Sequence, residues 1–173
     1  MRTDLTQQLI ELIPRMRRFA CGLSGERDRG DELVQAACER LLKHQHRLQP
    51  DTRLDSWLYR VIRNLHLDSL RSASVQDRGV EQMRQVADVS ARNADSLEGE
   101  MALHEIQRGM AALSEEHRTV LMLVCVEGLS YRETADILQV PMGTVTSRLV
   151  RARKALIEQL GEDSVKLELE ALG

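Results

Sequence analysis

The chain has few of the residues that interrupt helices and few that carry catalytic or metal chemistry. Its 173 residues include three prolines, ten glycines and three cysteines. So little proline and glycine, together with no convincing alternating strand pattern, favours an all-α chain. No signal peptide and no membrane-length apolar run is present, so we expect a cytoplasmic protein with no membrane insertion.

The cysteines Cys21, Cys38 and Cys125 are odd in number, and each lies far from the others among apolar residues. That placement indicates reduced, buried thiols, although it leaves a redox or metal role open. His44 and His46 diverge on a helix and have no nearby cysteine to complete a zinc pattern, so we interpret them as surface residues. Without a nucleophile–base pair, phosphate loop or metal cluster, we expect no enzyme, no metal and no cofactor.

Charge is unevenly placed along the chain. The net charge of −3 argues against a general nucleic-acid coat. Residues 141–156 contain four basic residues and no acid, whereas residues 157–173 contain one lysine and five acids. Any contact with DNA must therefore be local and oriented.

Residues 128–156 are the most informative segment and indicate two helices joined by a tight turn. Ser130 and Glu133 form a capping box that begins the first helix, and Pro141 ends it. The second helix runs from about residue 141 to residue 160, and one stripe of it is apolar. The stripe consists of Val145, Leu149, Ala152, Leu156 and Leu160.

Another face of this second helix is polar and basic. It carries Thr144, Ser147, Arg148, Arg151 and Lys154. The second helix of a helix-turn-helix fits the DNA major groove and presents such side chains to base edges, so this face is a candidate DNA-reading surface. The alternative is a helical hairpin whose basic face is merely solvated.

Three amphipathic segments lie earlier in the chain. The first is interrupted by Pro14, which predicts a short helix followed by a longer one that begins near that proline. The second covers residues 31–44 with Asp31 as N-cap, and the third covers residues 55–71. Helical periodicity returns at residues 97–113, and a further helix follows Ser114 and stops at Gly128.

The third segment combines aromatic, arginine and amide side chains, which suit single-stranded DNA because rings and guanidinium groups stack on bases. The candidates are Trp57, Arg60, Arg63, Asn64, Asp68 and Arg71. Trp57 also has core spacing to Val61 and Leu65, so we interpret it mainly as a core residue.

The chain is thus predicted to form two small helical domains joined by a flexible linker. The N-terminal domain covers residues 1–73, the polar linker residues 74–95, and the C-terminal domain, with the helix-turn-helix, residues 96–173. A transient helical turn is expected in the linker near residues 81–86.

With these features in view, the chain resembles a bacterial sigma factor of the extracytoplasmic-function class, in the sigma-seventy superfamily. Three segments in the expected order carry the resemblance: DELVQAACERLLKH, SWLYRVIRNLHLDSLR and LSEEHRTVLMLVCVEGLSYRETADILQVPMGTVTSRLVRARKAL. It implies that the first binds the clamp helices of RNA polymerase, the second opens and reads the −10 promoter element, and the third reads the −35 element.

The resemblance also implies roles for single residues. The polymerase-binding stretch is matched by Asp31, Glu32, Leu33, Gln35 and Arg40. Asn64 matches a position that helps hold a base flipped out of the −10 element, and Arg153 matches a basic position of the third segment. Relatives often carry an aromatic residue where Cys38 stands, and larger or charged residues where Thr146 and Val150 stand.

The expected function is a promoter-specificity subunit, monomeric when free, with core RNA polymerase and promoter DNA as partners. The sequence shows no sensor domain, so we expect control by an anti-sigma factor. Two alternatives stay open. A stand-alone helix-turn-helix regulator would need a dimer interface, for which no apolar face remains unassigned. A sigma-like decoy that sequesters a regulator would not need Asn64 or the arginines of the recognition face.

Overall fold

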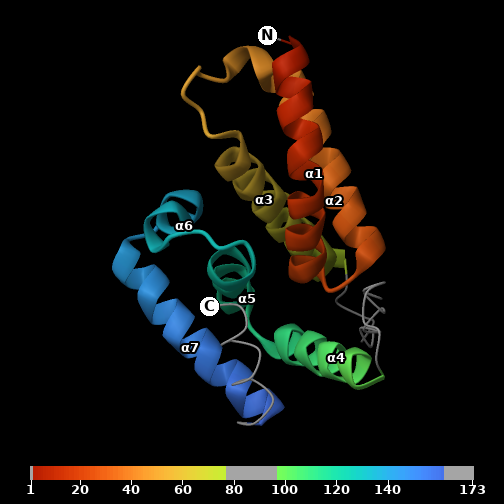
Figure 1. The fold of residues 1–173 in the computed structure, drawn as a ribbon, viewed down its shortest axis with the longest axis vertical. Helices are drawn as coiled ribbons and strands as arrows, with labels where there is room; N and C mark the ends of the chain where they lie inside the picture. The colour runs from red at the N-terminus through yellow and green to blue at the C-terminus, as the bar shows by residue number, and fades with distance from the viewer. Residues whose placement is uncertain (1, 77–96, 162–173) are drawn as a thin grey trace.

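A computed structural model describes residues 2–76 and 97–161, and within these ranges the chain is helical and has no strand (Figure 1). The predicted linker residues 77–95 and the helical turn near residues 81–86 lie outside the described residues. The elements are α1 (Arg2–Ser24), α2 (Arg27–His44), the 3₁₀ turn η1 (Gln45–Arg47), α3 (Leu54–Gln76), α4 (Leu97–Ala112), α5 (Glu115–Leu121), the π-helix η2 (Met122–Val126), α6 (Tyr131–Leu138) and α7 (Met142–Leu160).

The N-terminal unit consists of α1, α2 and α3, which lie side by side (Figure 1). Phe19 and Tyr59 meet edge to face in its core, with ring centroids 4.9 Å apart. Both side chains are fully buried, as are Leu41 and Leu58. Each fully buried large apolar side chain contributes about 1.5–3 kcal/mol of transfer free energy, so these inward stripes hold the three helices together.

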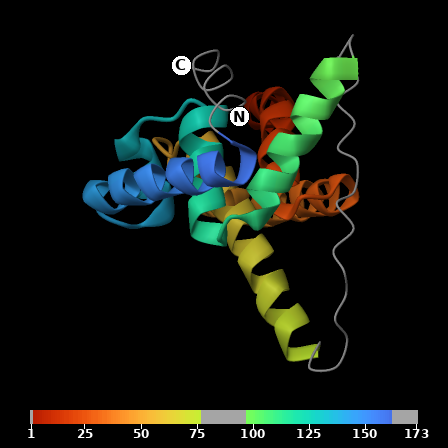
Figure 2. The same ribbon diagram turned by 90° about the horizontal axis from the view of Figure 1, so that it is seen from below.

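Three sequence-based expectations for this unit are wrong. α1 continues through Pro14, because the apolar residues before and after it, such as Leu9 and Met16, are buried on the same side. α2 begins at Arg27 rather than near Asp31, whose carboxylate pairs with Arg17 instead of capping the helix. α3 runs to residue 76, past the helix end predicted at residue 71, and its C-terminal end projects beyond the other helices (Figure 2).

The C-terminal unit follows the sequence prediction closely. Ser114 caps α5 by accepting a hydrogen bond from the His117 amide at 3.3 Å, and Gly128 has a φ of 71°. Ser130 and Glu133 form the predicted capping box at the start of α6. The predicted α7 stripe is buried from Val145 to Leu156, while Leu160 is only partly buried.

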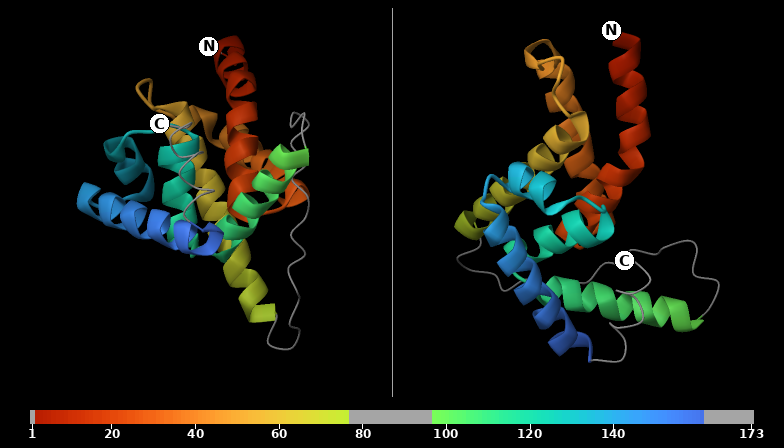
Figure 3. Two further views of the ribbon diagram at one scale, coloured as in Figure 1. Left: turned by 60° about the horizontal axis from the view of Figure 1, so that its bottom comes forward. Right: turned by 60° about the vertical axis from the view of Figure 1, so that its left-hand side comes forward.

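The two units pack against each other, and this arrangement is visible from two further directions (Figure 3). The C-terminal half of α1 meets α5 and η2, and α3 meets α6. At Gly22 of α1 an added Cβ atom would lie 2.3 Å from the Met122 Cε atom of η2, so the two units approach closely there.

The remaining sequence-based expectations concern cysteine, histidine and membranes. The three cysteines are free but half-buried rather than buried, and burial raises the pKa of the Cys21 and Cys38 thiols. His44 and His46 are exposed, as predicted. Among the described residues, no group of acids, cysteines and histidines could hold a metal ion. None of the described helices has the length and apolar character to span a membrane.

Candidate nucleic-acid interface

The candidate DNA-reading residues of α7 share one side of the helix. Ser147, Arg151 and Lys154 are exposed, and Thr144 is half-buried. The Ser147 hydroxyl donates to the Thr144 carbonyl at 3.1 Å, which leaves its oxygen free to accept a hydrogen bond from outside. Basic and hydroxyl side chains at helical spacing of three and four match the groups that contact phosphates and base edges.

Arg148 differs from its neighbours because it is already paired. Its Nη2 atom donates to Glu116 Oε1 at 3.1 Å, and its side chain is 20% exposed. Arg153 points off this face, as predicted, and its guanidinium lies 3.7 Å from Cys125 Sγ. Thr146, at the neighbouring exposed position, donates to the Met142 carbonyl within its own helix.

On α3, the candidate residues fall into two groups. Asn64, Asp68 and Arg71 are exposed, and Asp68 and Arg71 form a loose ion pair at 3.8 Å. Trp57 is half-buried and packs against the core, in agreement with its core spacing.

Arg60 and Arg63, by contrast, face the C-terminal unit. The Arg60 Nη2 atom donates to the Asp136 carbonyl of α6 at 2.9 Å, and its Nε atom is buried with no hydrogen-bond partner among the described residues. Burial and then the neighbouring charge of Arg148 lower the pKa of Arg63. Arg63 of α3 and Arg148 of α7 are therefore near enough for their charges to act on each other.

The candidate polymerase-binding residues lie on α2 with different exposures. Glu32, Gln35 and Arg40 are exposed, whereas Leu33 is buried in the core, so its side chain is not available at the surface. Asp31 forms a two-point ion pair with Arg17 of α1, at 2.7 and 3.1 Å, which fixes its carboxylate on the outer face of the unit.

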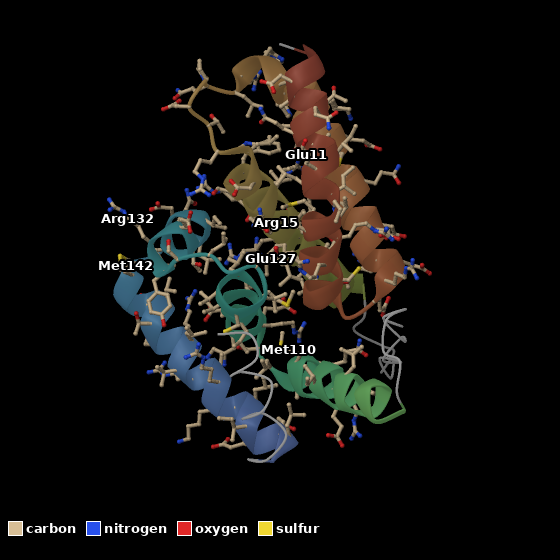
Figure 4. The ribbon with its side chains drawn as sticks, in the orientation of Figure 1. Glu11, Arg15, Met110, Glu127, Arg132 and Met142 are labelled. Carbon is tan, nitrogen blue, oxygen red and sulfur yellow. The ribbon has the colours of Figure 1, made fainter. Side chains whose placement is uncertain are left out.

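Sequence reasoning missed the buried carboxylate that joins the two units. Glu127, at the end of η2, has a side chain with no exposed area (Figure 4). Arg18 holds it with two hydrogen bonds of 2.8 and 3.0 Å, and Arg15 approaches to 3.4 Å. The Tyr59 hydroxyl donates to the same carboxylate at 2.7 Å. We call Glu127, Arg15, Arg18 and Tyr59 the Glu127 clasp.

The clasp is electrostatically consistent. Two arginines neutralise a buried carboxylate, and the paired geometry of Arg18 is the strong two-point form of such contacts. Burial and the hydrogen bond to Glu127 raise the pKa of Tyr59 well above its usual value, so its hydroxyl keeps the proton that it donates. The sequence signal was present: Glu127 is a lone acid directly after the apolar run of residues 120–126.

A second polar cluster crosses the same boundary. His66 Nε2 lies 2.9 Å from Glu115 Oε2, and Glu115 accepts from Arg118 Nη1 at 2.8 Å. The same Arg118 atom donates to the Leu23 carbonyl at the end of α1 at 2.9 Å. Arg118, itself 4% exposed, also donates to the carbonyls of Met110, Ala111 and Leu113.

The capping box of α6 also contacts the N-terminal unit. Arg53 donates to Glu133, the acid of the box, as well as to Asp55 at 3.0 Å. The hydrogen bond from Arg53, followed by those from the Ser130 amide and hydroxyl, lowers the pKa of Glu133 to about 2. The helix-turn-helix is thus tied to the three-helix unit at the start of its first helix.

Comparisons with known proteins cover both units. The family model of sigma-70 region 4 matches residues 103–156, and that of the sigma2 domain of PhyR matches residues 9–63. The chain is 30% identical over 169 residues to the ECF RNA polymerase sigma factor EcfG of Rhodopseudomonas palustris (strain TIE-1), which spans 94% of this chain and 88% of that protein.

Two solved structures extend the comparison. The sigma factor RpoE from Bartonella quintana, in its co-crystal with the anti-sigma factor NepR, superposes with a TM-score of 0.78 at 28% identity, over 92% of this chain and 98% of that chain. The anti-anti-sigma factor PhyR from Bartonella quintana, complexed with NepR, superposes with a TM-score of 0.60 at 16% identity, over 98% of this chain and 60% of that chain. The second likeness concerns the fold alone.

Proposed function

The chain belongs to the ECF family of RNA polymerase sigma factors, and on that basis we propose that it directs core RNA polymerase to a set of promoters. The observation that carries the proposal is the exposed face of α7, where Ser147, Arg151 and Lys154 lie together without an acid among them. One helix-turn-helix buries little surface on DNA. Attachment of the chain to polymerase raises the effective concentration of the helix-turn-helix at the promoter.

We assign the parts as follows. Residues 1–73 dock on polymerase through α2 and bind the −10 element on α3. Residues 74–95 connect the two domains, and residues 96–173 read the −35 element. Asn64, exposed on α3, is the proposed contact to an unpaired base. Arg60 and Arg63 can join it only after they leave the C-terminal unit, because Arg60 is held by the Asp136 carbonyl.

We further propose that an anti-sigma factor controls the chain. The support is the likeness, over 92% of this chain, to a sigma factor crystallised with the anti-sigma factor NepR. A regulator that prefers the packed arrangement of the two units shifts the population towards it without any change inside either unit. Affinity purification from uninduced cells should then recover the regulator in place of polymerase.

The match of residues 9–63 to the sigma2 domain of PhyR favours a second candidate function, a sigma-like decoy that sequesters a regulator. The two functions differ in one measurement. Run-off transcription with core polymerase and a genomic promoter pool should yield discrete transcripts from a sigma factor and none from a decoy. A chain that binds a regulator but supports no transcription would establish the decoy.

Asn64→Ala adds a test of the proposed role of α3. The variant should form holoenzyme normally but open promoters poorly, as read by permanganate footprinting, and a pre-melted promoter should restore only part of the loss. Gln8→Ala is the control, since it removes an exposed amide from α1. Normal melting by Asn64→Ala at limiting enzyme would show that the amide has no role in base capture.

A further inference from the structure

The contact between the two units has a buried charge at its centre. Glu127 belongs to the C-terminal unit, while Arg15, Arg18 and Tyr59 all belong to the N-terminal unit. Removal of the arginines would leave the Glu127 carboxylate, whose side chain has no exposed area, buried without its charge partners, so the cluster favours contact between the units. Every partner comes from this chain, so the contact needs no second protein.

Closure of the units engages two of the candidate DNA-binding cations, Arg60 and Arg63 of α3. Arg60 donates to the Asp136 carbonyl of α6. Arg63 is half-buried, and the charge of Arg148 in the C-terminal unit acts on it. The ion pair of Arg148 with Glu116 joins α7 to α5 within the C-terminal unit, so it does not depend on closure. A cation that already has a protein partner must give it up before it can neutralise a phosphate, and α3 cannot receive a DNA strand where α6 lies against it.

We propose that the chain inhibits itself: the Glu127 clasp closes the N-terminal unit onto the C-terminal unit and withholds Arg60 and Arg63 of α3 from DNA. Polymerase must open the clasp, and a regulator needs only to stabilise a state that the free chain already adopts. The consequence for DNA and polymerase rests on the proposed function, whereas the closure itself does not.

The clasp is suited to reversible opening. Arg15 and Arg18 have side chains that are 35% and 51% exposed even in the closed state, so both are partly hydrated already. When the units separate, water can solvate the Glu127 carboxylate and the Tyr59 hydroxyl in place of their partners. Opening therefore exchanges protein contacts for hydration and leaves the apolar core of α1, α2 and α3 intact.

The size of the effect follows from population arithmetic. If polymerase binds only the open chain, its apparent affinity is reduced by the fraction of chain that is open. A change that weakens the closed state tenfold therefore tightens polymerase binding by up to about tenfold. A regulator that binds only the closed chain is weakened in proportion to the loss of closed chain, which is small as long as the closed state still predominates.

The test uses the free full-length chain and four variants. Glu127→Gln keeps the shape of the side chain and removes its charge, and a variant with both Arg15→Gln and Arg18→Gln removes the partners from the other unit. The triple variant combines the three changes. Glu11→Gln is the matched control, because Glu11 is an exposed acid on α1 that accepts a hydrogen bond from Gln7 in the same helix. Small-angle X-ray scattering measures closure, circular dichroism measures helix content, and fluorescence anisotropy measures affinity for core polymerase.

The clasp variants should keep the helix content of wild type, increase the radius of gyration and bind polymerase up to about tenfold more tightly. The triple variant should match Glu127→Gln, because the shared interaction is already lost. A radius of gyration unchanged in both clasp variants would overturn the proposal, and so would a loss of helix in both. If the variants open as expected but wild type and variants alike fail to bind polymerase, the clasp stands and the proposed function fails.

Discussion

Arg118 offers the sharpest test of what holds the C-terminal unit together. We consider Arg118→Met, which keeps an unbranched stem of similar length and removes the guanidinium. The Arg118 guanidinium donates hydrogen bonds to the carbonyls of Leu23 and Leu113, and both bonds are buried. A buried acceptor left without a donor costs about 1–3 kcal/mol, so two such acceptors predict a loss of about 2–6 kcal/mol in the free energy of unfolding.

The measurement is urea unfolding followed by circular dichroism, with Arg132→Met as the control because Arg132 is exposed on α6 (Figure 4). The control should change the free energy of unfolding by less than about 0.5 kcal/mol, as surface substitutions usually do. Arg118→Lys should fall between the two, since one ammonium cannot reach the end of α1 and the end of α4 at once. A loss below about 1 kcal/mol for Arg118→Met would refute the reasoning, because it would mean that water satisfies these carbonyls equally well.

Three further predictions concern pH, packing and DNA. The pKa of Glu133 is lowered to about 2 from 4.5, so its contribution to stability is fully present above pH 4.5 and is lost as the pH falls towards 2. In urea unfolding measured over a pH series, Glu133→Gln should therefore lose less stability than wild type as the pH falls through this range. The same acid-dependent loss in both proteins would contradict the assignment. Gly30→Ala should destabilise the chain by about 1–3 kcal/mol in the same assay, because its Cβ atom would lie 2.8 Å from the backbone nitrogen of Cys21, and a neutral change would show that α1 and α2 can shift apart. When the holoenzyme binds promoter variants, Arg151→Ala should cost about 1–3 kcal/mol of binding free energy and change the base preference. Lys154→Ala should weaken binding to all sequences alike and reduce its salt dependence. An unchanged base preference for Arg151→Ala would show that this residue does not read a base.

The helix-turn-helix was readable from the sequence because its signals are local. A Ser130–Glu133 capping box, a proline at the turn and apolar residues three and four apart act within a few residues of one another. The same reasoning found Ser114 as the cap of α5 and Gly128 as the stop before α6. Such features depend on backbone geometry that neighbours in sequence impose, so tertiary packing had little to change.

Helix boundaries in the N-terminal unit were less predictable, since packing decided them. Proline interrupts an isolated helix, but α1 has buried residues on both sides of Pro14 and continues through it. Asp31 has the character of an N-cap, yet Arg17 on the neighbouring helix takes its carboxylate, and α2 begins at Arg27. In both cases a contact with another part of the chain outweighed the local preference.

By itself the sequence determined the all-helical fold, its two units, the helix-turn-helix and the family. Only the tertiary structure decided which of the candidate residues are free. Arg60 and Arg148 have the same chemistry as Arg151, but the first two are taken up by Asp136 and Glu116. Glu127 can be buried as a carboxylate because Arg18, 109 residues away in sequence, pairs with it in the fold. Charge pairing across such a separation depends on which helices meet, and no local pattern encodes that.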